Sequence, residues 1–169
     1  MGNDSMKTIA VIALCALPLT LATQALAQKS ASPGDVDRGR YLVRIGGCND
    51  CHTAAYPEKA GAIPEAEWLT GVPVGFQGPW GTTYPANLRL AMNAMTEAQW
   101  MANARKPMKP PMPWFALRDM TDADLRAIYR YVKSLGPAGT PMPEFVPPGG
   151  AVKTPFIVFV PQPPPATPR

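Results

Sequence analysis

A five-residue motif, CNDCH at positions 48–52, constrains this chain more than any other feature of its sequence. Two cysteines stand three positions apart, and the residue that follows them, His52, is the only histidine present. Two thiols at this spacing can bond to the two vinyl groups of one haem, and the next imidazole then lies beneath the iron. The motif therefore predicts one covalently attached haem c, bound through Cys48 and Cys51, with His52 as an axial iron ligand.

Two other kinds of site use a CxxC pair. A zinc site needs four Cys, His or acidic ligands, and once the N-terminal leader described below is removed, no further cysteine or histidine is left. A redox-active dithiol in an exported oxidoreductase also fits the two cysteines. The histidine directly after the pair favours haem, and colour separates the two interpretations, because a dithiol protein would be colourless.

The first residues are typical of a secretory signal peptide. A basic start at Lys7 precedes an apolar run over 9–21, and the small residues Ala25-Leu26-Ala27 supply a cleavage site. The run is roughly 13 residues long, whereas a membrane-spanning helix needs about 20. We therefore expect residues 1–27 to be a signal peptide, the mature chain to be periplasmic, and no transmembrane segment to remain. An uncleaved membrane anchor is the alternative.

Capping signals predict three helices between residues 35 and 136. The first covers 36–45, with Asp35 as its N-cap and two glycines at its end. The second opens on the capping box TEAQ at 96–99 and runs to about residue 105. The third begins at TDAD, 121–124, with acids at the positive end of its dipole, and stops at Gly136-Pro137.

The remaining stretches of this region carry no sustained periodicity. Residues 57–87 contain five prolines and five glycines, and so long a loop is unusual in a compact domain unless it folds around a prosthetic group. Residues 107–113 form a second irregular stretch, an extended proline-rich strap. The expected fold is all-α, a small domain over 35–136 with about three main helices and long loops around one covalent haem. Residues 28–34 are expected to be a flexible lead-in.

The sixth iron ligand cannot be a second histidine, and a methionine thioether is the natural candidate. Met112 stands in the run KPPMPW at 109–114, where flanking prolines fix the backbone torsions and so hold its sulfur in place. We predict Met112 as the ligand and Met108 as the runner-up. Another ligand or an open sixth position remains possible at this point, and an open position would indicate a haem enzyme or gas sensor.

Five short stretches resemble class I c-type cytochromes, most closely the cytochrome c subunits that partner periplasmic dehydrogenases. DRGRYL at 37–42 resembles that family's first helix. MPWF at 112–115, with MTDADL at 120–125 and AIYRYV at 127–132, resembles its methionine loop and last helix. GTTYPAN at 81–87 resembles the segment that lies against the haem propionates. The resemblance implies a single-electron carrier rather than an enzyme, placed between a periplasmic dehydrogenase and an acceptor of the respiratory chain.

The same resemblance implies roles for individual residues. Gly39 and Val43 would cross Ile128 and Tyr131 where the first and last helices pack. Tyr84, Asn87 and Trp114 would line the haem pocket. Trp100 would lie against the haem as well. Tyr84 and Asn87 would donate hydrogen bonds to a propionate, and their plain alternatives are a surface tyrosine and a turn asparagine. The two tryptophans could equally be core residues.

Charge and the C-terminal composition complete the prediction. The net charge is +4 at pH 7, which suits docking to an acidic protein face but is too small and scattered for nucleic-acid binding. Residues 137–169 form a proline-rich extension that holds half of the 22 prolines. Within it, the β-prone apolar run 156–160 is expected to be ordered, either against the domain or as a strand added to a partner.

Overall fold

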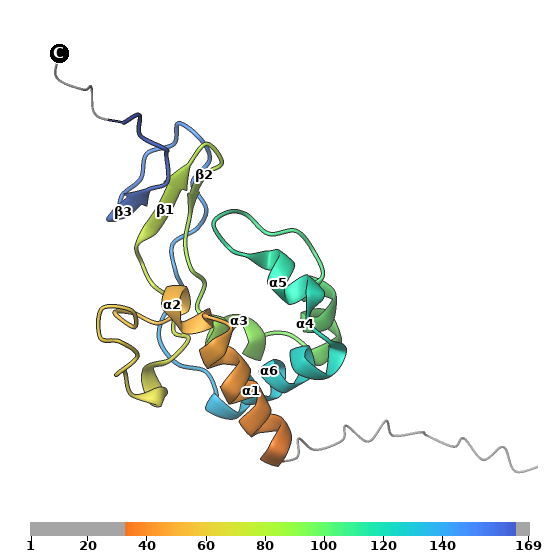
Figure 1. Cartoon of the computed structure of the whole chain (residues 1–169). Coiled ribbons are helices and arrows are strands. Elements are labelled where there is room, and N and C mark those ends of the chain that lie inside the picture. The colour runs from red at the N-terminus through yellow and green to blue at the C-terminus, as the bar shows by residue number, and fades with distance from the viewer. Residues whose placement is uncertain (1–32, 165–169) are drawn as a thin grey trace, which may run out of the picture. The chain divides into compact units, whose positions relative to one another are not determined.

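The structure, a computed structural model, describes residues 33–164. The predicted signal peptide and residues 28–32 of the lead-in lie outside this range. The described residues pack as one unit (Figure 1). Its elements, in chain order, are α1 (Pro33–Ile45), α2 (Cys48–His52), the 3-10 helix η1 (Glu65–Glu67), β1 (Gly75–Gly78), β2 (Gly81–Thr83), α3 (Leu88–Asn93), α4 (Glu97–Ala104), α5 (Trp114–Asp119), α6 (Asp122–Leu135) and β3 (Phe156–Val158).

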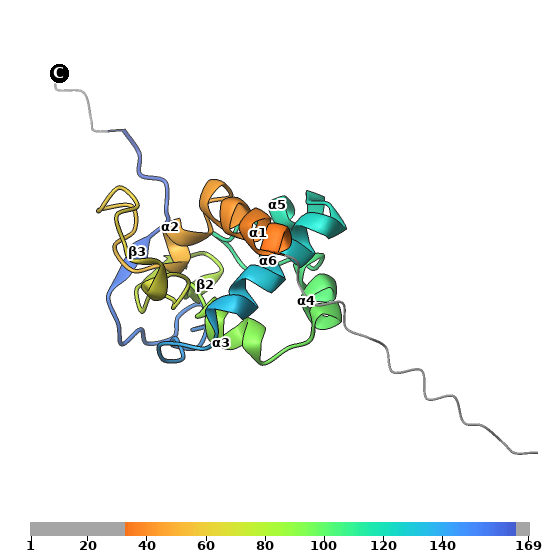
Figure 2. The same ribbon diagram turned by 90° about the horizontal axis from the view of Figure 1, so that it is seen from below.

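The first and last long helices, α1 and α6, cross each other (Figure 2), and Gly39 lies at their contact. A Cβ atom built on this glycine would lie 2.1 Å from the Ala127 carbonyl oxygen and 2.6 Å from the Tyr131 Cβ. Val43 and Ile128, 1% and 3% exposed, are buried. The predicted crossing of the two helices is therefore confirmed, and only a residue without a side chain lets their backbones approach so closely.

The three predicted helices are present, with one correction at the start of α1. The helix begins at Pro33, so Asp35 lies inside its first turn and the prediction that Asp35 is the N-cap was wrong. Proline suits the first turn of a helix because its missing N–H would have had no partner there. Consequently the last two residues of the expected lead-in are helical.

Local signals placed the other two helices correctly. Thr96 and Gln99 form the predicted capping box at the start of α4, each side chain bonding the other's backbone N–H. The Thr121 hydroxyl accepts from the Asp124 N–H at the start of α6, and Gly136 ends that helix at a positive φ of 68°. None of the helices between residues 33 and 164 is long and apolar enough to cross a membrane.

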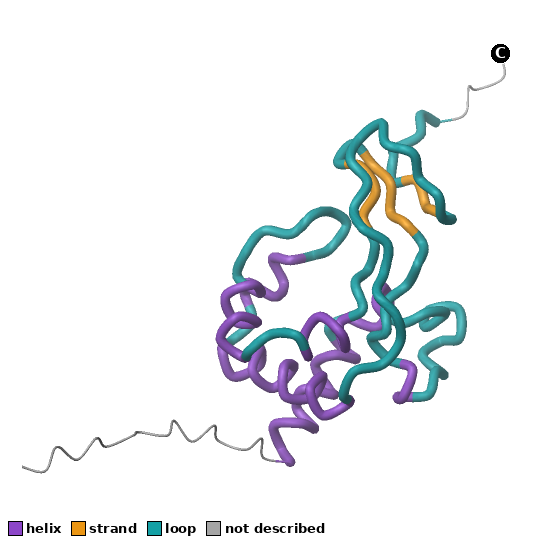
Figure 3. The backbone as a smooth tube through the Cα atoms, turned by 180° about the vertical axis from the view of Figure 1, so that it is seen from behind, coloured by secondary structure: helices purple, strands orange, loops and turns teal. Residues whose placement is uncertain are grey.

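A small three-stranded sheet, with the order β2-β1-β3, was not predicted within this mostly helical fold. β1 and β2 are antiparallel and form a hairpin closed between Gly78 and Gly81, whereas β3 is parallel to β1. Figure 3 shows the strands lying together, apart from the helices. The two hairpin strands fall within residues 57–87, where glycines interrupt the alternation of side chains that would have revealed them.

The C-terminal extension is packed against the rest of the unit. The Asn87 side chain donates two hydrogen bonds, to the carbonyl oxygens of Ala138 at 2.8 Å and Thr140 at 3.1 Å. The predicted ordering of the apolar run is seen in β3, and beyond it the Phe159 ring packs edge-on against Phe76 with centroids 5.4 Å apart. The run nevertheless leaves its apolar side chains 43–54% exposed.

Candidate haem site

The two motif cysteines lie on α2, one helical turn apart, so their thiols share a face of this short helix. The chain enters α2 through Gly47, whose φ of 69° favours glycine. Both thiols are partly buried, and no disulfide joins them. Burial raises the pKa of Cys48 to about 11 and also raises the pKa of Cys51. Redox-active dithiols depend on a lowered thiol pKa, so this environment does not favour a dithiol enzyme.

His52 is buried and is oriented by one hydrogen bond. Its Nδ1 lies 2.7 Å from the Ala86 carbonyl oxygen, and because a carbonyl can only accept, Nδ1 carries the hydrogen. Burial lowers the pKa of His52, although the bond to Ala86 opposes this, so the ring is favoured in its neutral form. Nε2 is then deprotonated, with no hydrogen-bond partner among the described residues. This is the state in which an imidazole ligates a metal.

Contacts behind the motif fix α2 to the segment that follows it. The Thr53 hydroxyl donates to the Asn49 side-chain oxygen at 2.8 Å and accepts from the Leu69 N–H at 2.8 Å. The Gly71 N–H donates to the His52 carbonyl oxygen at 2.8 Å. Asn49 and Thr53 project from a different face of α2 than Cys48 and Cys51, so these contacts hold the helix without using either thiol.

The proline-rich strap, residues 107–113, connects α4 to α5 (Figure 1). Met108 and Met112 are both partly buried and pack against the core. The Met112 carbonyl oxygen accepts from the Trp114 N–H at 2.8 Å, which closes a tight turn into α5. Both sulfurs are therefore on a constrained segment, and the assignment of Met112 over Met108 stays a prediction.

The residues predicted to line the haem pocket have partners within the chain. The Tyr84 hydroxyl lies 2.7 Å from the Thr154 hydroxyl. Asn87 caps α3 with its side-chain oxygen and uses both side-chain N–H groups on the extension, so a bond to a propionate would require one of these to break. Trp114 is half-buried, with the Arg118 guanidinium over its ring. Their contacts with the haem stay predictions.

Trp100, which the resemblance also placed near the haem, is a buried residue of the helical core. It is 7% exposed, and its indole N–H donates to the Leu125 carbonyl oxygen at 2.8 Å. This bond joins α4 to α6. Trp100 is therefore a core residue, as the alternative to a haem contact predicted.

Sequence reasoning missed two parts of the site. The carbonyl of Ala86 orients His52, but a backbone carbonyl has no signature in a sequence. Thr83 donates to the strap at the Pro110 carbonyl oxygen, 2.7 Å away, and the Phe145 ring lies beneath the Lys109 ammonium. Phe145 belongs to the extension, beyond the residues that carry the resemblance, so no local signal pointed to it.

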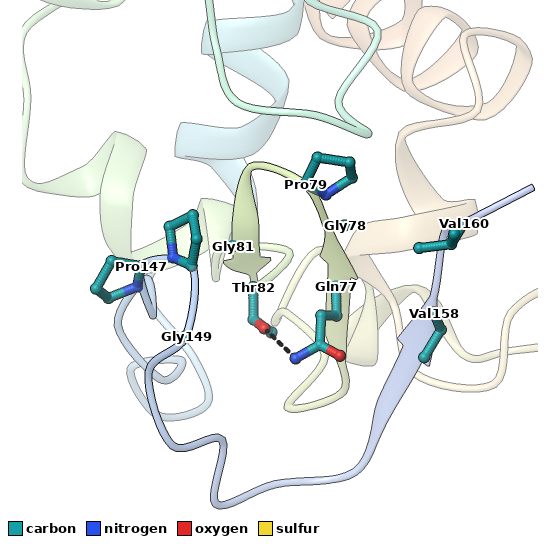
Figure 4. Close-up of a pocket in the computed structure, with 10 residues that line it drawn as sticks. Gln77, Gly78, Pro79, Gly81, Thr82, Pro147, Gly149, Val158 and Val160 are labelled. Atoms are coloured by element: carbon teal, nitrogen blue, oxygen red, sulfur yellow. Dashed lines mark hydrogen bonds between the residues drawn. The ribbon is translucent and has the colours of Figure 1, made fainter.

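A surface hollow lies between the hairpin and the extension (Figure 4). Gln77 and Thr82 face it from the hairpin and are joined by a hydrogen bond of 3.3 Å, while Pro147, Val158 and Val160 line it from the extension. None of the residues that line it is ionisable. The lining of the hollow therefore contains no general acid or general base, and the Thr82 hydroxyl has no basic side chain within the lining to activate it.

The groups on α2 fit a covalently attached haem. Two free thiols share one helix face, and the imidazole after them presents an unprotonated nitrogen on a ring fixed by a backbone carbonyl. This combination of donors matches the attachment and proximal ligation of haem c. Cys48 and Cys51 would hold the porphyrin by thioether bonds, and His52 would bind its iron.

Comparison with known proteins agrees with this fit. The sequence pattern of the family described as Cytochrome c matches residues 36–136, more than half of the chain. The matched range contains the motif, the strap and the crossing of α1 with α6. No curated protein and no solved structure matches the chain. The chain belongs to the cytochrome c family, whose members bind haem c covalently and generally carry electrons.

Proposed function

We propose that the chain is a periplasmic single-electron carrier with one haem c attached to Cys48 and Cys51 and with His52 and Met112 as axial iron ligands. The observation that carries the proposal is the orientation of His52, whose Nδ1 donates to the Ala86 carbonyl oxygen and leaves Nε2 free. The haem, when bound, supplies an iron that gains or loses one electron. The part played by the protein is to hold both axial ligands in one arrangement.

Two features of the chain keep that arrangement constant. The bond to Ala86 fixes the tautomer and ring plane of His52, so the imidazole does not need to rotate when the charge at the iron changes. Prolines on both sides of Met112 restrict the backbone that carries the thioether. A site whose ligands stay in place in both oxidation states exchanges electrons with little reorganisation, which suits a carrier better than an enzyme.

The proposed location and partners rest on the sequence and on surface charge. The signal-peptide pattern at residues 1–27 favours export to the periplasm. Periplasmic dehydrogenases are in the same compartment. Lys106, directly before the strap, and Lys109, within it, are exposed, and positive charge at the ligand side favours docking to an acidic face of a dehydrogenase or a downstream acceptor. Affinity purification of the holoprotein from the periplasm, with identification of the associated proteins, tests both points. Recovery from the cytoplasm alone would contradict them.

A Met112→Ala variant tests the sixth ligand. We expect the ferric protein to lose the weak red charge-transfer band of methionine ligation and to become able to bind carbon monoxide readily when reduced. The reduction potential should fall by about 0.1–0.3 V, a fraction of the ~0.8 V that axial ligands span, because the thioether favours ferrous iron. Absorption spectroscopy and redox titration measure these changes.

Met108→Ala is the matched control, since both methionines lie on the strap and both are partly buried. It should retain the band and the potential. The reverse result, with the band lost only in Met108→Ala, would make the runner-up the ligand. A wild-type protein that is already high-spin and binds carbon monoxide would instead favour a haem enzyme or gas sensor.

A further inference from the structure

The strap that carries Met112 is held by two side chains from distant parts of the chain. Thr83, at the end of β2, donates from its hydroxyl to the Pro110 carbonyl oxygen at 2.7 Å. The Lys109 ammonium lies 4.6 Å from the centre of the Phe145 ring, within the range of a cation–π interaction. The second of these anchors belongs to the extension, beyond the residues that match the cytochrome c family.

The two anchors lie opposite each other in a short backbone ladder. The Thr82 N–H donates to the Val146 carbonyl oxygen at 2.8 Å, and the Val146 N–H donates to the Thr82 carbonyl oxygen at 3.0 Å. This bridge is antiparallel, so Thr83 lies opposite Phe145. Side chains at opposite positions of an antiparallel pair share one face. The hydroxyl and the ring therefore meet the strap from the same side.

The hairpin is shaped to receive the extension at this point. Gly81 has a φ of 101°, and a Cβ atom there would lie 2.4 Å from the Val146 carbonyl oxygen and 3.0 Å from the Phe145 ring. Any side chain at Gly81 would thus be strained by the backbone and would also push the extension away. The ladder depends on this glycine.

The extension is also fixed before and after the ladder. Upstream, Asn87 donates to the carbonyl oxygens of Ala138 and Thr140. Downstream, the Gly75 N–H donates to the Pro155 carbonyl oxygen at 2.9 Å, where β3 joins the sheet. Phe145 is consequently held between two attachment points rather than on a free tail, so its ring can position the strap.

We propose that the C-terminal extension is a brace for the methionine strap, and that Thr83 and Phe145 are positioning residues for the Met112 sulfur. The proposal rests on the proposed ligation by Met112. Neither side chain needs to touch the haem. Each limits the opening of the strap, because the strap must leave both anchors before it can move away from the hairpin. Loss of either anchor should therefore raise the frequency with which the sulfur leaves the iron.

The rate of cyanide binding to the ferric holoprotein measures this frequency, since cyanide binds after the sulfur has left. At saturating cyanide we expect Thr83→Val and Phe145→Ala each to increase the limiting rate of cyanide binding about three- to tenfold. This is the rate ratio that corresponds to the free energy of one partly exposed hydrogen bond or cation–π contact. Hydrogen exchange of the amides over residues 108–114 should accelerate in parallel. The exchange measurement reports the strap itself and does not depend on electron-transfer activity.

Phe156→Ala is the matched control for the loss of the Phe145 ring. Both residues belong to the extension, and they are similarly exposed, Phe145 at 40% and Phe156 at 43%. Phe156→Ala should bind cyanide at the wild-type rate. Phe145→Leu keeps an apolar side chain without the aromatic face, so it provides a folded alternative if the alanine variant is unstable, and it should still accelerate cyanide binding. Wild-type rates and wild-type exchange in both Thr83→Val and Phe145→Leu would overturn the brace.

Met112→Ala distinguishes the brace from the ligation on which it rests. If the spectrum of Met112→Ala shows the loss of methionine ligation while the anchor variants behave like wild type, only the brace fails. If the spectrum of Met112→Ala is unchanged, the ligation fails, and the brace as a positioning device for that sulfur fails with it.

Discussion

Alanine in place of Gly39 is expected to lower the free energy of unfolding of the holoprotein by about 3 kcal/mol, the upper part of the range for overpacked cores. The added methyl group would lie 2.1 Å from the Ala127 carbonyl oxygen, and a backbone atom in the middle of α6 cannot move aside alone. The two helices would have to separate along their contact. Thermal unfolding followed by far-UV circular dichroism should show a fall in Tm of about 10 °C.

Gly34→Ala is the control for this variant, because Gly34 lies on the same helix and a Cβ there would meet nothing within 4 Å. Alanine is a better helix former than glycine by up to about 1 kcal/mol, so this variant should unfold at the wild-type temperature or slightly above it. Equal Tm values for the two variants would show that the close crossing does not limit stability.

In the Cys48→Ala/Cys51→Ala double variant, we expect no haem to stay attached to the polypeptide after denaturation. Both thioether bonds require these thiols, and no other cysteine lies in the chain beyond the predicted leader. Haem staining after denaturing electrophoresis should be lost completely, and the mass of the exported polypeptide should lack the mass of the haem. Each single variant should retain reduced staining, since one thioether can still form.

Asp50→Asn is the control within the same motif. Asp50 is exposed and lies between the two cysteines without being part of the attachment pattern. Its substitution should leave haem staining unchanged. Staining that survives in the double variant would contradict covalent attachment at these positions.

Two of the three helices that the sequence predicted, α4 and α6, begin with the local capping chemistry expected of them. The capping box at Thr96 and the N-cap at Thr121 use side chains within three residues of the helix start, so their signal is contiguous. Helices α3 and α5 have six residues each, which is too short for an apolar period to emerge. Asn87 was predicted to contact a propionate or to be a turn residue, and its role as the N-cap of α3 was not foreseen because the pattern did not reveal that helix.

The sheet was missed for a different reason. Its hairpin strands contain Gly75, Gly78 and Gly81, which remove the side-chain alternation. Its third strand comes from about 80 residues further along the chain, and the pairing of distant segments cannot be deduced from local composition. The apolar run 156–160 could be recognised as ordered, but its partner could not.

In the haem site, too, the parts that depend on neighbouring residues could be predicted, and the parts that depend on distant segments could not. Covalent attachment needs thiols and imidazole in one contiguous run, so the motif was readable directly. Orientation of the imidazole depends on the Ala86 carbonyl, and restraint of the strap depends on Phe145, each brought from elsewhere by the fold. The attachment motif could thus be read from the sequence, whereas the groups that orient His52 and contact the strap could not.

The hydrogen bonds of Asn87 have a consequence for exchange of segments between cytochromes. The family pattern ends at Gly136, yet the two carbonyl groups that satisfy this buried amide belong to residues 138 and 140. A hybrid protein joined at the end of the shared pattern would leave these donors unpaired, at a cost of about 1–3 kcal/mol for each buried group. A junction for recombination therefore has to lie beyond Thr140 to keep these bonds, and beyond Val158 to keep the third strand of the sheet as well.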